Sequence, residues 1–204
     1  MDTRDRILDA AEHVMRTRGF ARTTTKQIAR SAGYSEATIY KHFDDKTDLF
    51  LAVLHERLPS FQPFVEELVR EPGRGSLRAN LAATARKAIA FYAESFPVSA
   101  SVFSQPDLLA AHRAAVTRQN AGPDRPIKAL TRYLRGEQQR GRIRSDTDCA
   151  AAASLLLGAC FQYAFLASFA QQAADSQWAA ERADSITDTL LAGLSPPDSG
   201  GPSS

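Results

Sequence analysis

Hydrophobic positions recur along this chain at the three- and four-residue spacing of α-helices. Between Leu77 and Ser95 the apolar side chains fall on one side of such a helix. Between Ser176 and Leu194 they recur at intervals of four, three and four residues. No segment shows the alternation of apolar and polar residues that is typical of a half-buried strand. The pattern therefore predicts an all-α protein.

Two prolines stand where further helices are expected to begin. Proline is tolerated in the first turn of a helix, because its missing N–H would have no helical partner there. Pro97 follows the 77–95 segment, and Pro106 comes nine residues later. We expect each of them to open a new helix.

The segment from Thr24 to Phe43 contains two short helical patterns that meet at a glycine. Thr24 or Thr25 can cap the first helix, and Ser35 can cap the second, because their hydroxyls accept hydrogen bonds from unpaired amides. Gly33 follows the last apolar residue of the first helix, where a left-handed turn costs glycine almost nothing. This layout is typical of a helix-turn-helix that reads DNA.

The second of these helices has one buried side and one polar side. Ile39 and Phe43 lie one turn apart and must point inward. The opposite side, which we call the reading face, is centred on Lys41. In a major groove, small polar groups at its centre would reach base edges and longer groups at its flanks would reach phosphates. The expected DNA-binding residues are Thr25, Lys26, Tyr34, Ser35, Ala37, Thr38, Tyr40, Lys41, His42 and Lys46.

Positive charge is concentrated around this segment. The 204 residues carry a formal net charge of only +2. From His13 to Phe43, however, there are six lysines and arginines and one acid, which gives 6 − 1 = +5. Such a run is most often a solvated face, but beside a helix-turn-helix pattern it favours a surface that faces phosphates.

The same segment resembles the DNA-binding domain of the TetR family of bacterial transcriptional regulators. The residues that carry the resemblance are Gly19-Phe20, Thr23-Thr24-Thr25, Ile28-Ala29, Ala32-Gly33, Thr38 to Phe43, Lys46 and Leu49. The resemblance implies an all-helical homodimer of nine or ten helices that binds a palindromic operator. It also implies a C-terminal domain whose small-molecule ligand releases the DNA. Tyr34 and Ala37 depart from the residues common in the family.

Pattern and resemblance together predict two domains. Residues 1–50 would form a three-helix DNA-binding domain, and residues 51–194 a helical domain for ligand binding and dimerisation. The remaining segment, 195–204, is rich in Pro, Gly and Ser, and we expect it to be disordered.

The stretch from Cys149 to Ala174 contains no charged residue. Its length would allow a membrane span, but alanine dominates it and several polar residues interrupt it, so we favour a soluble helix buried on every side. One side would pack on its own domain and the other on a second subunit. With the last helix of each subunit this would give a four-helix dimer bundle. The expected interface residues are Ala153, Leu157, Phe161, Ala164, Ala179, Ala183, Ile186 and Leu190.

Aromatic residues are frequent in the C-terminal part of the chain. Most of them would be core, but an apolar pocket with a few polar groups is also the usual form of a small-molecule site. Gln162 is of interest because an unpartnered amide inside an uncharged helix would cost roughly 1–3 kcal/mol. The candidate ligand-binding residues are Phe91, Tyr92, Phe103, His112, Tyr133, Phe161, Gln162 and Phe165.

Several other classes of function lack sequence support. The four histidines are scattered, no metal-binding spacing occurs, and no glycine-rich phosphate loop is present, so we expect no metal and no cofactor. The charged N-terminus and the two cysteines fit a cytoplasmic protein. An all-α enzyme is therefore disfavoured. A ligand-released repressor leads, with an activator, a ligand-independent regulator or a nucleoid-associated protein as alternatives.

Overall fold

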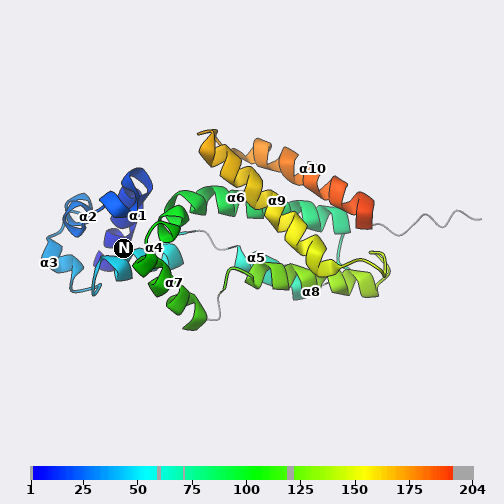
Figure 1. Cartoon of the computed structure of the whole chain (residues 1–204), viewed down its shortest axis with the longest axis horizontal. Coiled ribbons are helices and arrows are strands. Elements are labelled where there is room, and N and C mark those ends of the chain that lie inside the picture. The colour runs from blue at the N-terminus through cyan, green and yellow to red at the C-terminus, as the bar shows by residue number, and fades with distance from the viewer. Residues whose placement is uncertain (1, 59–60, 71, 119–121, 195–204) are drawn as a thin grey trace, which may run out of the picture. The chain divides into compact units, whose positions relative to one another are not determined.

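The computed structural model describes residues 2–58, 61–70, 72–118 and 122–194, and every regular element in these ranges is a helix (Figure 1). This confirms the predicted all-α class. The tail expected to be disordered, 195–204, lies outside the described residues. The helices are α1 (Thr3–Arg22), α2 (Thr25–Ala32), α3 (Glu36–Ile39), α4 (Lys46–Glu56), α5 (Gln62–Arg70), α6 (Leu77–Phe103), α7 (Pro106–Arg118), α8 (Arg125–Gln139), α9 (Cys149–Phe169) and α10 (Ser176–Leu194).

The chain forms two compact units. The N-terminal unit consists of Met1–Pro59 with Glu94–Gly122, and the C-terminal unit of Ser60–Ala93 with the chain from Pro123 onward. The functional division predicted from sequence, with DNA binding in residues 1–50 and regulation in 51–194, is a statement about activity and stays a prediction.

The N-terminal unit is built on a core shared by α1, α2, α3 and α4. Ile7, Leu8 and Met15 from α1 are buried together with Ile28 of α2 and Ile39 of α3. α1 continues past Gly19, but the backbone kinks there at a left-handed φ of 72°. The kink places Phe20 against Phe50 of α4, with ring centroids 4.7 Å apart in an edge-to-face arrangement.

The core of the C-terminal unit is formed by α8, α9, α10, α5 and the first part of α6. α9 lies alongside α10 and α8, as the yellow helix of Figure 1 shows. Both cysteines are free and buried in this core. Burial raises the pKa of Cys160 to about 12, so this thiol is a packing group rather than a reactive one.

One predicted helix start is wrong. Pro106 is the first residue of α7, as expected, but Pro97 lies inside α6 and does not begin a helix. A proline removes one helical hydrogen bond, yet two later residues of α6, Val98 and Val102, are buried in the N-terminal core. Their burial explains why the helix continues to Phe103 despite the proline.

A buried carboxylate ties the start of α6 to α8 within the C-terminal unit. The Glu137 side chain is completely buried; its Oε1 accepts a hydrogen bond of 2.6 Å from the backbone N–H of Gly73. Its Oε2 lies 3.2 Å from Nη1 of Arg142. One turn earlier on α8, the hydroxyl of Tyr133 accepts a hydrogen bond of 2.9 Å from the amide of Asn80. These bonds hold the loop before α6. Within this loop Gly73 has a left-handed φ of 91°, a conformation that favours glycine.

Candidate DNA-reading surface

The first helix of the helix-turn-helix is held by a complete capping box. The amide of Gln27 donates to Oγ1 of Thr24 over 3.2 Å, and the Gln27 side chain accepts from the amide of Thr24 over 3.0 Å. Thr24 is therefore the cap, and Thr25 is the first helical residue. Reciprocal bonds of this kind satisfy two amides that a helix start leaves unpaired.

The turn between the two helices depends on its glycine. Gly33 has φ 77° and ψ 28°, the left-handed conformation predicted from the sequence. The amide of Tyr34 then donates to the carbonyl of Ala29 over 2.9 Å, which closes the end of α2. Ser35 caps α3 by accepting from the amide of Thr38 over 3.3 Å. The regular helix ends at Ile39, and hydrogen-bonded turns carry the chain on to Phe43.

The predicted division of the second helix into two sides is present in the structure. Ile39 and Phe43 are buried in the N-terminal core. On the reading face Tyr40 is 53% exposed, and Tyr34 and Thr38 are half-buried. The remaining exposed residues are Lys26, Ser35, Ala37, Lys41 and His42. Eight of the ten predicted DNA-binding residues are thus partly or fully exposed, and their contact with bases stays a prediction.

The other two predicted residues have polar groups that are engaged inside the protein. Thr25 is buried, and its hydroxyl bonds to the carboxylate of Glu36 and lies 3.3 Å from the hydroxyl of Tyr40. The Nζ of Lys46 donates to the carbonyl of Phe20 over 2.6 Å and lies 4.0 Å from the centre of that ring. Burial lowers the pKa of Lys46. Direct contact of either residue with DNA would require these bonds to be exchanged.

Two arginines of α1 reach this region and were not singled out by the sequence. The guanidinium of Arg6 lies 5.2 Å from the ring centre of Tyr34, and that of Arg4 lies 5.2 Å from the ring centre of Phe43. Cation–π contacts of this kind hold an aromatic ring in place. No local motif could reveal them, because Arg6 and Tyr34 are 28 positions apart in the sequence and Arg4 and Phe43 are 39 positions apart.

Substitution of the reading face should weaken DNA binding without unfolding the protein. Lys41→Ala removes an exposed charge at the centre of the face and should weaken operator binding by about 1–3 kcal/mol. Tyr40→Phe removes a hydroxyl from an exposed ring and should also weaken it. Band shifts on an operator selected from random DNA would measure both, with Lys128→Ala, an exposed lysine of α8, as the control. Full affinity in both variants would refute the assigned face.

The predicted dimer interface needs a correction. Five of its residues are buried in the core of their own unit and cannot meet a partner: Ala153, Leu157, Ala164, Ala179 and Ala183. Ile186 and Leu190 are partly buried against the same core, whereas Phe161 is 46% exposed. Because α9 is apolar all round, its sequence did not show which side faces inward.

The opposite side of α9 is exposed and apolar, although eight of the side chains of this helix are buried. Leu155 is 66% exposed and Phe169 is 81% exposed. At 100° per residue the exposed side chains fall on one side of the helix. We call this group the α9 stripe; its members are Leu155, Phe161, Phe165, Leu166 and Phe169. By length and composition alone α9 could also cross a membrane, but a buried helix of a soluble protein has the same features.

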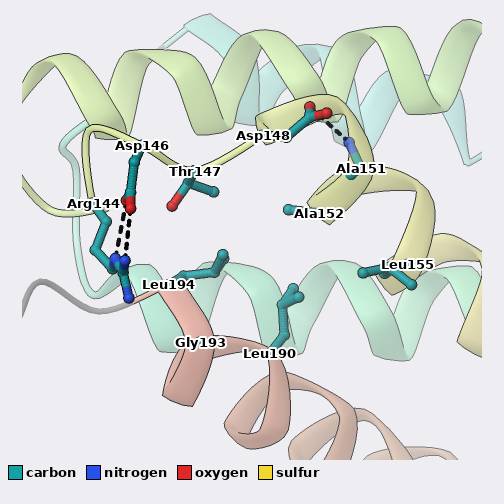
Figure 2. A pocket seen from close by; sticks show the side chains of 10 residues that line it. All are labelled: Arg144, Asp146, Thr147, Asp148, Ala151, Ala152, Leu155, Leu190, Gly193 and Leu194. Carbon is teal, nitrogen blue, oxygen red and sulfur yellow. Dashed lines mark hydrogen bonds and ion pairs between the residues drawn. The ribbon is translucent and has the colours of Figure 1, made fainter.

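A shallow pocket of about 290 Å³ adjoins the N-terminal end of α9 (Figure 2). One side is apolar and includes Leu155, Leu190 and Leu194. The polar side holds an ion pair between Arg144 and Asp146, with 2.6 Å between Nη2 and Oδ2. The pocket thus begins at a residue of the α9 stripe, and none of the predicted ligand-binding residues lines it.

The predicted ligand-binding residues do not form one site. Among the described residues Phe91, Tyr92 and Phe161 form one contact group, with ring centroids 5.2 Å apart for the first pair and 5.4 Å for the second. Burial raises the pKa of Tyr92 to about 12. Tyr133 instead bonds to Asn80, and the ring of Phe165 stacks on Phe169 at 6.3 Å.

Three further candidates are corrected by their positions. Gln162 is exposed, so its amide does not need the buried partner that the sequence suggested. Phe103, 78% exposed, and His112 belong to the N-terminal unit, whereas the aromatic cluster belongs to the C-terminal one. Helical spacing indicates which residues share a side of one helix, but it does not indicate which helices meet.

Sequence models of two domain families match this chain. Residues 7–53 match the bacterial regulatory proteins of the tetR family, and residues 79–193 match the C-terminal domain of AefR-like transcriptional repressors. The second match alone covers more than half of the chain. This chain belongs to the TetR family. The resemblance seen in the sequence is thereby confirmed, and the function of the family is transcriptional regulation.

Individual TetR-family relatives are similar to this chain over different shares of its length. The uncharacterised regulator YvkB of Bacillus subtilis is 46% identical over 54 residues, which are 26% of this chain and 29% of that protein. A family member from Mesorhizobium loti has the same fold, with a TM-score of 0.75 and 23% identity over 95% of this chain and 97% of its own. A complex of SmeT with triclosan gives a TM-score of 0.66 and 26% identity over 100% and 97% of the two chains. Elsewhere SmeT is described as the repressor of a Stenotrophomonas maltophilia multidrug efflux pump.

The sequence identity to these curated relatives extends over 26% to 32% of this chain. The matched segments span about a quarter to a third of the length of those proteins. The fold is therefore shared along the chain, whereas the effector and the operator of this protein have to be argued from its own residues.

Proposed function

We propose that this TetR-family protein is a cytoplasmic repressor that binds a palindromic operator as a homodimer and is released by a small, largely hydrophobic ligand. The observation that carries the proposal is the exposed reading face around Lys41, held by the capped helices α2 and α3. The match of residues 79–193 to the C-terminal domain of AefR-like repressors supports repression as the outcome.

The α9 stripe supports the homodimer. In a two-fold symmetric contact the same patch meets itself, so each residue of one copy faces a residue equally far from the axis in the other. An antiparallel pair of α9 helices crossing near residue 160 would bring Phe169 of one copy to Ala151 of the other. Ala151 and Leu155 line the pocket at that end, and the exposed Gly158 near the crossing would let the helices approach closely.

The aromatic cluster supports a hydrophobic ligand. Phe61 stacks on Phe91 with centroids 6.1 Å apart, and Tyr92 meets Phe161 edge-to-face. A flat apolar molecule could take the place of one ring in such a cluster, because its faces and edges would find the same partners. SmeT, which shares the fold, binds the aromatic compound triclosan. A ligand that binds the DNA-free form more tightly than the DNA-bound form lowers the affinity for DNA. The factor is the same as the one by which DNA lowers the affinity for the ligand.

A reporter gene placed behind the selected operator tests this function. We expect expression to fall when the protein is present and to recover when small aromatic compounds, triclosan among them, are supplied. Band shifts with the same compounds should show release of the DNA at the concentrations that restore expression. Expression that rises with the protein would indicate an activator and overturn the proposal, as would repression that no hydrophobic compound relieves.

A further inference from the structure

Two histidines from different helices face each other in the N-terminal unit. His55 lies on α4 and His112 on α7, with ring centroids 6.3 Å apart and ring planes inclined by 31°. The Nδ1 atom of His112 is buried and has no hydrogen-bond partner within the described part of the chain. Buried polar atoms are nearly always paired, and an unpaired one costs roughly 1–3 kcal/mol. The pair is therefore an unsatisfied polar site between two packed helices.

We infer that His55 and His112 form a binding site for a divalent transition-metal ion. A metal–nitrogen bond of about 2.0–2.1 Å on each side, plus the half-width of each ring, places two imidazoles on one ion with centres roughly 5–6.5 Å apart. The observed 6.3 Å lies at the upper end of this range, where the two imidazoles stand nearly opposite each other on a five- or six-coordinate ion. A tetrahedral ion would bring the ring centres to about 5 Å. Coordination would also provide the partner that Nδ1 of His112 lacks.

The surroundings favour an imidazole-binding ion over a hard cation. Imidazole suits Zn²⁺, Cu²⁺ and Ni²⁺, whereas Mg²⁺ and Ca²⁺ require several oxygen ligands. The neighbouring carboxylate of Glu56 is bound by Arg4 over 2.6 Å on both oxygens. Arg57 in turn holds Asp5 and Asp9 on α1. Acidic ligands near this end of α4 are thus already engaged.

The site would have an open coordination sphere. Among the described residues, no group of three or more His, Cys, Asp or Glu side chains is arranged to hold a metal. Two imidazoles would bind the ion, and water or a small anion would complete its shell. Such a site binds more weakly than a structural zinc site with four protein ligands, so we expect reversible binding.

An ion at this site would join α4 to α7. α4 begins three residues after Phe43, at the end of the helix-turn-helix, so a bridge from His55 to α7 restrains the helix that follows the reading face. If the ion and DNA favour different positions of α4, ion binding changes the affinity for DNA. DNA then changes the affinity for the ion by the same factor. This consequence rests on the proposed function, whereas the metal site itself does not.

Metal titration of the full-length protein, freed of metal beforehand, tests the inference. We expect calorimetry to show one Zn²⁺ or Ni²⁺ ion per chain, and Co²⁺ to develop visible absorption bands of a nitrogen-ligated ion. His55→Asn and His112→Asn should each weaken binding by on the order of tenfold or more, since loss of even an outer partner of a metal ligand costs about 10–100-fold. The matched control is His13→Asn, an exposed histidine of α1 in the same unit.

The possible results of this titration either support the metal site or contradict it. Loss of binding in both variants with retention in His13→Asn supports the site, and a metal-dependent rise of the thermal midpoint seen only in wild type and control supports it further. No binding by the wild type, or equal binding by all three variants, would overturn it. Operator binding by the metal-free protein is measured in parallel, so a failed metal site is not confused with a failed DNA-binding function.

Discussion

Leu155→Asp and Phe169→Asp should each convert the protein from a dimer to a monomer and abolish most operator binding. Both side chains are largely exposed on the α9 stripe, so the substitutions leave the core of the unit intact. Loss of a large apolar interface contact, here replaced by a charge, costs about 2 kcal/mol or more, and two-fold symmetry places each change twice in the interface. About 4 kcal/mol corresponds to a roughly thousandfold weaker dimer. A monomer presents one reading face and cannot contact both half-sites of the operator at once.

Sedimentation at micromolar concentration, followed by band shifts on the selected operator, measures both effects. Phe103→Asp is the matched control, because Phe103 is also an exposed phenylalanine, 78% accessible, but belongs to the N-terminal unit. It should remain dimeric. Dimers of unchanged stability in both α9 variants would show that the exposed apolar side of this helix serves another purpose.

Arg142→Ala should strongly destabilise the C-terminal unit. It leaves the carboxylate of Glu137 completely buried without its ionic partner. Removing one member of a buried pair costs about 3–5 kcal/mol, a large part of the stability of roughly 5–15 kcal/mol typical of a domain. Urea denaturation followed by circular dichroism would measure the loss.

Two further variants make this prediction specific. Arg144→Ala removes another arginine that pairs with a carboxylate, but its partner Asp146 is exposed, so the free energy of unfolding should hardly change. Glu137→Gln keeps an oxygen that can accept from the amide of Gly73 and should be tolerated better than Glu137→Ala. If Arg142→Ala and Arg144→Ala behaved alike, the buried pair would not hold the loop before α6.

Local chemistry made the helix-turn-helix predictable. The hydroxyls of Thr24 and Ser35 and the left-handed Gly33 act within a few residues of their own positions, so sequence alone locates the caps and the turn. The buried side of the second helix follows from the spacing of Ile39 and Phe43 in the same way. These features depend on neighbours along the chain rather than on the packing of distant helices.

Features set by contacts between distant segments could not be predicted in this way. The hydroxyl of Thr25 is buried because Glu36 lies across the turn from it, and Pro97 is tolerated because Val98 and Val102 are packed beyond it. α9 gave no indication of its inward side, because both sides are apolar and its packing against α8, α10 and α6 decides which is covered. The aromatic residues were likewise chosen by type, and the packing that joins Phe91, Tyr92 and Phe161 depends on contacts between helices.

Selection of DNA fragments by the purified full-length protein is the most direct test of the central claim. We expect one enriched sequence with two-fold symmetry, which two protein chains bind and which the Lys41→Ala variant binds more weakly. Fragments retained without a common sequence, or a single asymmetric half-site bound by one chain, would contradict a dimeric operator-binding repressor.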